Sequence, residues 1–228
     1  QILSAHSDVH GAGEFGSVSA LASSQDQVVP DVLRDAASIL RMDAPGCAAM
    51  AANYLRRSGA QARHGEHFVT NKLPTNFQRV GLFALLFPHA PVIHVQRDPR
   101  DNLLSIYFED FTGYHPYAYD LVDLAVQYRE QERLMQHWKS VVPNPVFSLR
   151  YEDLVADLPG MIGRLADFLR IEPEGAMERF YEQERAISTA SKWQVRQKLY
   201  SSSVGRWQPY AGQLKPLLDA LEELPAPG

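Results

Sequence analysis

Side chains that could bind a ligand stand where predicted β-strands end: the basic residues Lys72 and Arg97, and the aromatic residue Tyr151. A cation in such a place lies near the N-terminus of the following helix, where unpaired backbone N–H groups and the helix dipole favour negative charge. Ligands of parallel α/β sheets bind beyond the carboxyl ends of the strands. Lys72 and Arg97 are therefore the first candidates for a site that binds a phosphate or a related anion.

Arg97 follows a β-branched run at residues 91–96 and precedes an Asp-Pro pair, which is a favourable N-cap and first helical residue. Its guanidinium would meet free N–H groups and a helix dipole, an arrangement that predicts a phosphate site. Ser105 falls on the same face of the following helix and could add a hydroxyl donor. The alternatives are a structural ion pair between Arg97 and Asp101, and a serine without any binding role.

Lys72 lies between a short predicted strand and a helix that starts with proline, where it could donate to an anionic oxygen. The plain alternative is a lysine in a solvated loop. Tyr151 closes another predicted strand and could stack on a planar ligand, and packing in the core is its alternative.

The elements that must position these residues alternate between strand and helix, which is typical of an α/β fold with a parallel sheet. Two of the predicted strands end shortly before Lys72 and Arg97, and the third ends at Tyr151. Apolar spacing and turn residues predict strands at 67–70, 91–96 and 145–151, and helices at 30–41, 48–57, 74–87, from 99, and at 119–139, 159–169, 173–181 and 214–224.

Composition narrows the class of protein. The chain has 228 residues, of which 45% are hydrophobic and 21% charged, so it has the length of one α/β domain and is not a disordered or fibrous chain. A net charge of −5 argues against a general nucleic-acid binder, so an anion must be held by a local basic cluster. No apolar run approaches ~18 residues, and the first residues do not resemble a signal peptide. We therefore expect a cytoplasmic protein without a transmembrane segment.

The sequence gives little indication of a metal site or a disulfide bond. The single cysteine, Cys47, cannot form an internal disulfide or a cysteine-based zinc site. The eight histidines have no metal-ligand spacing, so we expect no metal. The glycine-rich phosphate loops of kinases and dinucleotide-binding proteins are also absent.

Several segments together resemble a known family. They read VTNKLPTNFQRVGLFALLFPHAPVIHVQRDPRDNLLSIYF, LRYEDLVADLPGMIGRLADFL and ISTASKWQVRQKLYSSSVGRWQPY. They are similar to sulfotransferases of the tyrosylprotein-sulfotransferase type, in the bacterial branch that often follows tetratricopeptide repeats, and the resemblance runs from about Gln1 to Leu224. It implies a P-loop-like, three-layer α/β fold with a central parallel sheet flanked by helices. The implied sulfuryl donor is 3′-phosphoadenosine 5′-phosphosulfate (PAPS), and the product is adenosine 3′,5′-bisphosphate (PAP).

The resemblance also implies roles for particular residues. Arg97 and Ser105 match the 3′-phosphate site, and Tyr151 matches the tyrosine beside the adenine. The C-terminal cofactor loop of the family falls on Ser191 and Arg206.

The implied catalytic residues are Lys72 and Glu14. Lys72 matches the lysine that stabilises charge around the transferred sulfuryl group. Glu14 is the best match to the carboxylate base, and an exposed loop carboxylate is its alternative. The acceptor would be a hydroxyl of a tyrosine, sugar, lipid or small metabolite, and no metal is required because cationic side chains supply the charge.

One family feature has no counterpart in the sequence. Members carry a P-R-S-G type loop, which holds the 5′-phosphosulfate, before a helix that the segment Gln1–Leu3 would end. We therefore expect residues 1–228 to be one sulfotransferase domain without its N-terminal strand and that loop, and inactive in transfer by itself. The rival interpretations are a catalytically inactive nucleotide-binding or interaction domain of the same fold and a relative of nucleotide kinases.

Overall fold

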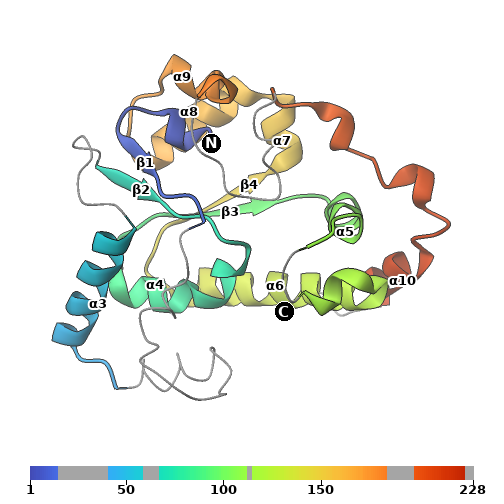
Figure 1. Ribbon diagram of the computed structural model, residues 1–228, viewed down its shortest axis with the longest axis horizontal. Helices are drawn as coiled ribbons and strands as arrows, with labels where there is room; N and C mark the ends of the chain where they lie inside the picture. The colour runs from blue at the N-terminus through green and yellow to red at the C-terminus, as the bar shows by residue number, and fades with distance from the viewer. Residues whose placement is uncertain (15–40, 59–66, 112–114, 184–197, 224–228) are drawn as a thin grey trace. The chain divides into compact units, whose positions relative to one another are not determined.

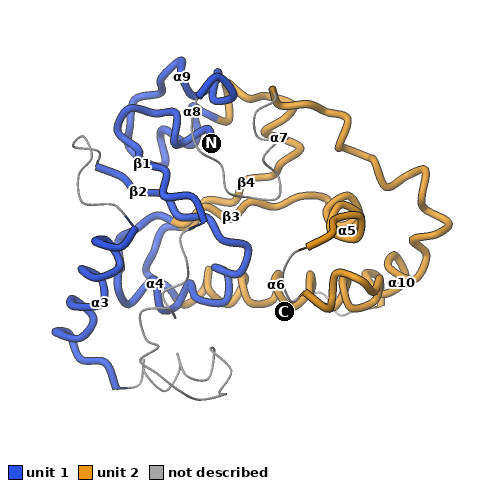
Figure 2. Tube along the Cα trace, viewed as in Figure 1, with its two compact units in different colours: residues 1–91, 142–145, 162–196 blue, residues 92–141, 146–161, 197–228 orange. Residues whose placement is uncertain are grey.

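The computed structural model describes residues 1–14, 41–58, 67–111, 115–183 and 198–223 (Figure 1). The chain divides into two compact units, which Figure 2 distinguishes by colour. The predicted helix at 30–41 lies almost wholly outside the described residues. The first unit comprises residues 1–91, 142–145 and 162–196, and the second comprises 92–141, 146–161 and 197–228.

The first unit contains a parallel pair of short strands, β1 and β2, in which Val9 lies opposite Phe68. Helices α3 and α4 pack against each other through Tyr54, Leu82 and Leu86, all of them buried. The elements of this unit are η1 (Leu3–Ala5), β1 (Val9–Gly11), α3 (Ala44–Arg57), β2 (Phe68–Thr70), η2 (Pro74–Arg79), α4 (Val80–Leu86), α9 (Gly175–Glu178) and η4 (Phe180–Glu182).

Local sequence sets the start of α3. The Asp43 side chain accepts a hydrogen bond from the Gly46 N–H at 2.8 Å, and a proline stands in the first turn. The helix therefore begins at Ala44, four residues before the predicted start at 48. The segment predicted as one helix at 74–87 is a 3-10 helix followed by an α-helix, and the change comes at Arg79, whose φ of −123° is not helical.

The second unit contains the other parallel pair, β3 and β4, with Val92 opposite Val146 and Gln96 opposite Arg150. Helix α8 (Leu158–Leu169) begins in this unit and ends in the first. The other elements are β3 (Val92–Gln96), α5 (Pro99–Tyr107), η3 (Pro116–Tyr119), α6 (Leu121–Val141), β4 (Val146–Arg150), α7 (Tyr151–Ala156), η6 (Ser201–Ser203), η7 (Gln208–Tyr210) and α10 (Lys215–Glu223).

A leucine-rich core fixes α5 within the second unit. Buried side chains of α5, α6 and the C-terminal segment pack together, and Leu104, Leu124 and Leu217 are almost completely excluded from solvent. Burying one such side chain is worth about 1.5–3 kcal/mol. Helix α5 therefore has a firm place in its unit, and this matters because it follows Arg97 and carries Ser105. The buried members of the cluster are Leu103, Leu104, Leu124, Ala125, Leu214, Leu217 and Leu221.

The predicted α/β character and the parallel strand pairing are confirmed. In the part of the chain that the structure describes, the strands form two separate two-stranded sheets, so the single central sheet and its three layers stay a prediction. One expectation was wrong: Tyr151 begins α7 instead of ending a strand. Gln1–Leu3 leads into the 3-10 helix η1, and the Ala5 N–H donates to the Gln1 carbonyl at 3.0 Å, so the expected end of a helix at these residues stays a prediction. Of the helices described, none combines the length and the apolar character needed to cross a bilayer.

Candidate functional site

The strand ends carry the candidate residues in both units. Glu14 follows β1 and Lys72 follows β2 in the first unit, whereas Arg97 follows β3 and Tyr151 follows β4 in the second. Because each pair of strands is parallel, the two carboxyl ends within a pair lie at one edge. Each unit therefore gathers its own pair of candidates at the edge where ligands of parallel sheets bind.

Lys72 and Glu14 meet because backbone pairing continues beyond β1 and β2. The Ala12 N–H donates to the Thr70 carbonyl at 2.9 Å, and the Lys72 N–H donates to the Gly13 carbonyl at 3.0 Å. Gly13 has a φ of +68°, a left-handed conformation that side chains other than glycine rarely adopt. The turn brings the Lys72 ammonium to Glu14, and its Nζ donates to Oε1.

This ion pair is open to solvent, with the Lys72 side chain 67% and the Glu14 side chain 26% exposed. Ion pairs of this exposure contribute about 0–1 kcal/mol to folding, so the contact between Lys72 and Glu14 adds little to the stability of the fold. An accessible carboxylate can accept a proton, and an adjacent ammonium can neutralise charge that develops on a substrate oxygen. The pair is chemically suited to transfer of an anionic group to a hydroxyl.

Arg97 lies at the junction between β3 and α5. The Asp98 carboxylate caps α5 by accepting the Arg100 N–H at 2.9 Å, as its sequence position predicts. The Arg97 side chain makes no ion pair with Asp101. Instead, its Nη2 donates to the Ser203 carbonyl at 2.6 Å, and its guanidinium carbon lies 5.1 Å from the centre of the Tyr151 ring. Its Nε is buried and has no hydrogen-bond partner among the described residues.

Tyr151 is half-buried beside Arg97, and its hydroxyl donates to the Tyr200 carbonyl at 3.3 Å. Burial raises the pKa of this phenol, so it remains neutral at neutral pH. The next residue, Glu152, accepts the Asp98 N–H at 2.7 Å. This bond joins the end of β4 to the end of β3, and so it keeps Tyr151 and Arg97 together.

The segment that carries Arg206 is tied to α5. Asp101, which is 2% exposed, accepts the Gly205 N–H at 2.6 Å and the Trp207 N–H at 2.9 Å. Arg206 lies between these two residues and is exposed. Ser105 lies one helical turn after Asp101 and therefore on the same face of α5. Arg206 and Ser105 are thus carried by elements that contact each other.

Not every candidate can be placed. Ser191 lies outside the described residues. The sequence did not reveal that Asp101 accepts hydrogen bonds from the loop around Arg206. It also did not reveal the hydrogen bond that Glu152 accepts from Asp98. The partners of Asp101 and Glu152 are 104, 106 and 54 residues away, so no local pattern in the sequence could have found them.

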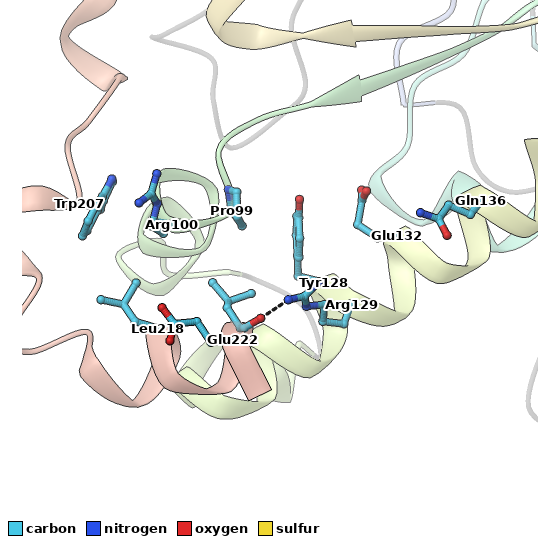
Figure 3. A pocket seen from close by; sticks show the side chains of 10 residues that line it. Pro99, Arg100, Tyr128, Arg129, Glu132, Gln136, Trp207, Leu218 and Glu222 are labelled. Atoms are coloured by element: carbon cyan, nitrogen blue, oxygen red, sulfur yellow. Dashed lines mark hydrogen bonds between the residues drawn. The ribbon is translucent and has the colours of Figure 1, made fainter. Parts of the chain in front are cut away.

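The second unit also contains a pocket of about 550 Å³ between the start of α5 and helices α6 and α10 (Figure 3). Arg129, which lines the pocket, donates to the Leu221 carbonyl, and the Arg100 guanidinium carbon lies 4.3 Å from the centre of the Trp207 ring. The cofactor candidates described above are not among the residues that line it. Those residues are Pro99, Arg100, Tyr128, Arg129, Glu132, Gln136, Trp207, Leu218, Leu221 and Glu222. Within the described ranges, no group of three or more His, Cys, Asp or Glu side chains is arranged to hold a metal ion.

Comparison with known proteins gives the family. A model of the sulfotransferase family matches residues 1–175. The chain belongs to the sulfotransferase family. The matched range contains Glu14, Lys72, Arg97, Ser105 and Tyr151, whereas the other candidates lie beyond it.

One curated relative aligns with nearly the whole chain. It is a protein of Aquifex aeolicus (strain VF5) described as an uncharacterized protein, and it is 31% identical over 231 residues. The alignment covers 98% of this chain but 30% of the relative. This sulfotransferase chain thus spans less than a third of the length of that relative.

Proposed function

We propose that the chain is a PAPS-dependent sulfotransferase domain, comprising residues 1–228, that transfers a sulfuryl group to a hydroxyl acceptor. Its fold would be the P-loop-like, three-layer one, and it would belong to the tyrosylprotein-sulfotransferase-like branch that often follows tetratricopeptide repeats. One observation carries the proposal. Each strand that the structure describes ends within three residues of a residue that the family resemblance assigns to the reaction: Glu14, Lys72, Arg97 or Tyr151.

In this proposal the second unit binds the bisphosphate part of the cofactor. Arg97, Ser105 and Arg206 would bind the 3′-phosphate, with Ser191 as a further ligand, and Tyr151 would lie beside the adenine. The buried and unpartnered Nε of Arg97 supports this assignment, because a buried N–H donor without an acceptor is costly and a phosphate oxygen would supply one. The exposure of Arg206 leaves its guanidinium available to a ligand.

Glu14 and Lys72 would provide the chemistry. The acceptor oxygen forms a bond to sulfur while the bond from sulfur to the bridging oxygen of the 5′-phosphate breaks, and PAP leaves with that electron pair. Glu14 accepts the proton of the acceptor hydroxyl as general base. Lys72 neutralises the negative charge on the oxygens around sulfur. Transfers of this kind depend mainly on positioning and charge stabilisation, by analogy with phosphoryl transfer.

A direct test is the affinity of the chain for PAP and for AMP, which differ by the 3′-phosphate, measured by isothermal titration calorimetry. We expect PAP to bind about 10–100-fold more tightly, since hydrogen bonds to a charged group contribute about 1.5–3 kcal/mol. Arg97→Ala should remove most of this preference. Arg133→Ala is the matched control, because Arg133 is an exposed arginine that pairs with Glu130 on α6. Equal affinities for the two nucleotides in the unmodified chain would overturn the cofactor assignment.

A further inference from the structure

We infer that Asp101 is a positioning residue that holds Arg206 where it can bind the 3′-phosphate, an inference that rests on the proposed function. The carboxylate accepts one N–H from each neighbour of Arg206: Oδ2 from Gly205 at 2.6 Å and Oδ1 from Trp207 at 2.9 Å. Both carboxylate oxygens are therefore used on the backbone that flanks the arginine. Arg206, the residue proposed to bind the cofactor, makes neither of these two bonds.

The burial of Asp101 shows how much this arrangement depends on those two bonds. A buried carboxylate is strongly unfavourable unless hydrogen bonds or charges compensate it. Asp101 is 2% exposed, and the loop supplies both of the hydrogen bonds that its side chain accepts in the described structure. Capping of α5 does not explain its presence, because Asp98 already performs that task.

The loop conformation points to the same role. Gly205 has a φ of +73°, which allows the chain to turn so that the N–H groups on both sides of Arg206 reach one carboxylate. The Arg206 side chain then returns to α5, where its guanidinium carbon lies 5.8 Å from the centre of the Phe108 ring. Arg97 fixes the preceding part of the segment through the Ser203 carbonyl. The loop is held before any ligand arrives, which lowers the ordering cost of binding.

The test uses Asp101→Asn, which preserves shape but leaves one acceptor oxygen and turns an NH₂ group towards the second N–H. We expect the affinity for PAP to fall about tenfold or more and the affinity for AMP to change less than about twofold. The amides of Gly205 and Trp207 should exchange with solvent faster. Asp157→Asn is the control, because Asp157 also accepts a glycine N–H, that of Gly160 at 2.9 Å, at the start of α8.

A double-mutant cycle separates positioning from general support of the fold. If Asp101 acts through Arg206, then Asp101→Asn costs little further PAP affinity in an Arg206→Ala background, whereas independent effects add. Additive losses, or unchanged PAP affinity in Asp101→Asn, would overturn the inference. If Asp101→Asn does not fold, Asp101→Ser, which keeps one small acceptor, takes its place in the same cycle.

The inference and the proposed function fail differently. A chain that does not distinguish PAP from AMP contradicts the proposed function before any Asp101 variant is made. A chain that prefers PAP and keeps this preference in the Asp101 variants contradicts the positioning role alone.

Discussion

His94 should make the stability of this domain sensitive to acid. It lies on β3, the strand that leads to Arg97, and is 7% exposed. Neither ring nitrogen has a hydrogen-bond partner among the described residues, and Nε2 lies 3.8 Å from Glu132 Oε1. Burial, reinforced by the positive charge of Lys139, lowers the pKa of His94 to about 4 from an ordinary value of 6.5.

The direction and size of the effect follow from linkage between protonation and folding. Below pH 6.5 the unfolded chain binds a proton at this histidine, whereas the folded chain does not until about pH 4, so acid favours unfolding. The difference between the two pKa values of His94 corresponds to roughly 3 kcal/mol of stability, of which about 2 kcal/mol is lost by about pH 5. This stability is present near neutral pH and disappears as the pH falls from 6.5 to about 4.

Urea unfolding of the chain and of His94→Leu at about pH 8 and about pH 5 measures this loss. The variant should lose about 2 kcal/mol less than the original chain over this interval, since leucine has a similar volume and does not titrate. Its stability at the higher pH should be equal or greater, because two unpartnered ring nitrogens are removed. His89→Gln, at an exposed histidine, is the control and should leave the pH dependence unchanged. The same loss in His94→Leu as in the original chain would refute the reasoning.

Three other predictions address the chemistry, the core and a helix cap. In the protein as it occurs naturally, Lys72→Ala and Glu14→Gln should each lower sulfuryl transfer from PAPS to a panel of phenol and sugar acceptors by about 10²-fold or more, with PAP affinity nearly unchanged. Lys215→Ala, at an exposed lysine paired with Asp219, is the control, and full activity in Lys72→Ala would remove the proposed role. Leu124→Ala should lower the free energy of unfolding by about 2–5 kcal/mol because Leu124 is completely buried. Urea unfolding of this variant and of Val126→Ala, at a half-exposed valine, would show whether burial is the cause. Asp43→Ala should cost about 1 kcal/mol through loss of the α3 cap, and an unchanged melting temperature would contradict that role.

Much of the local structure could be predicted from the sequence, because it depends on neighbouring residues. The β-branched run before Arg97 forms β3, and the Asp-Pro pair after it caps and begins α5 through a bond between residues two apart. The three-residue strand β1 escaped prediction because its residues Val-His-Gly hold one β-branched side chain, whereas the equally short β2, Phe-Val-Thr, consists of residues that favour strands. The start of α3 lies before the predicted one because the Asp43 side chain caps the helix, and apolar spacing alone does not reveal a cap.

The sequence by itself determined which residue types stand at the ends of strands and therefore which kind of ligand the chain could bind. Only the tertiary structure decided which of these residues meet. Glu14 reaches Lys72 across 58 residues because β1 and β2 pair in parallel and their pairing continues to Lys72. Arg97 stacks on Tyr151 instead of pairing with Asp101, and Asp101 binds the loop around Arg206 instead. Contacts between distant segments depend on strand register and on how helices pack, and neither is encoded in the spacing of neighbouring residues.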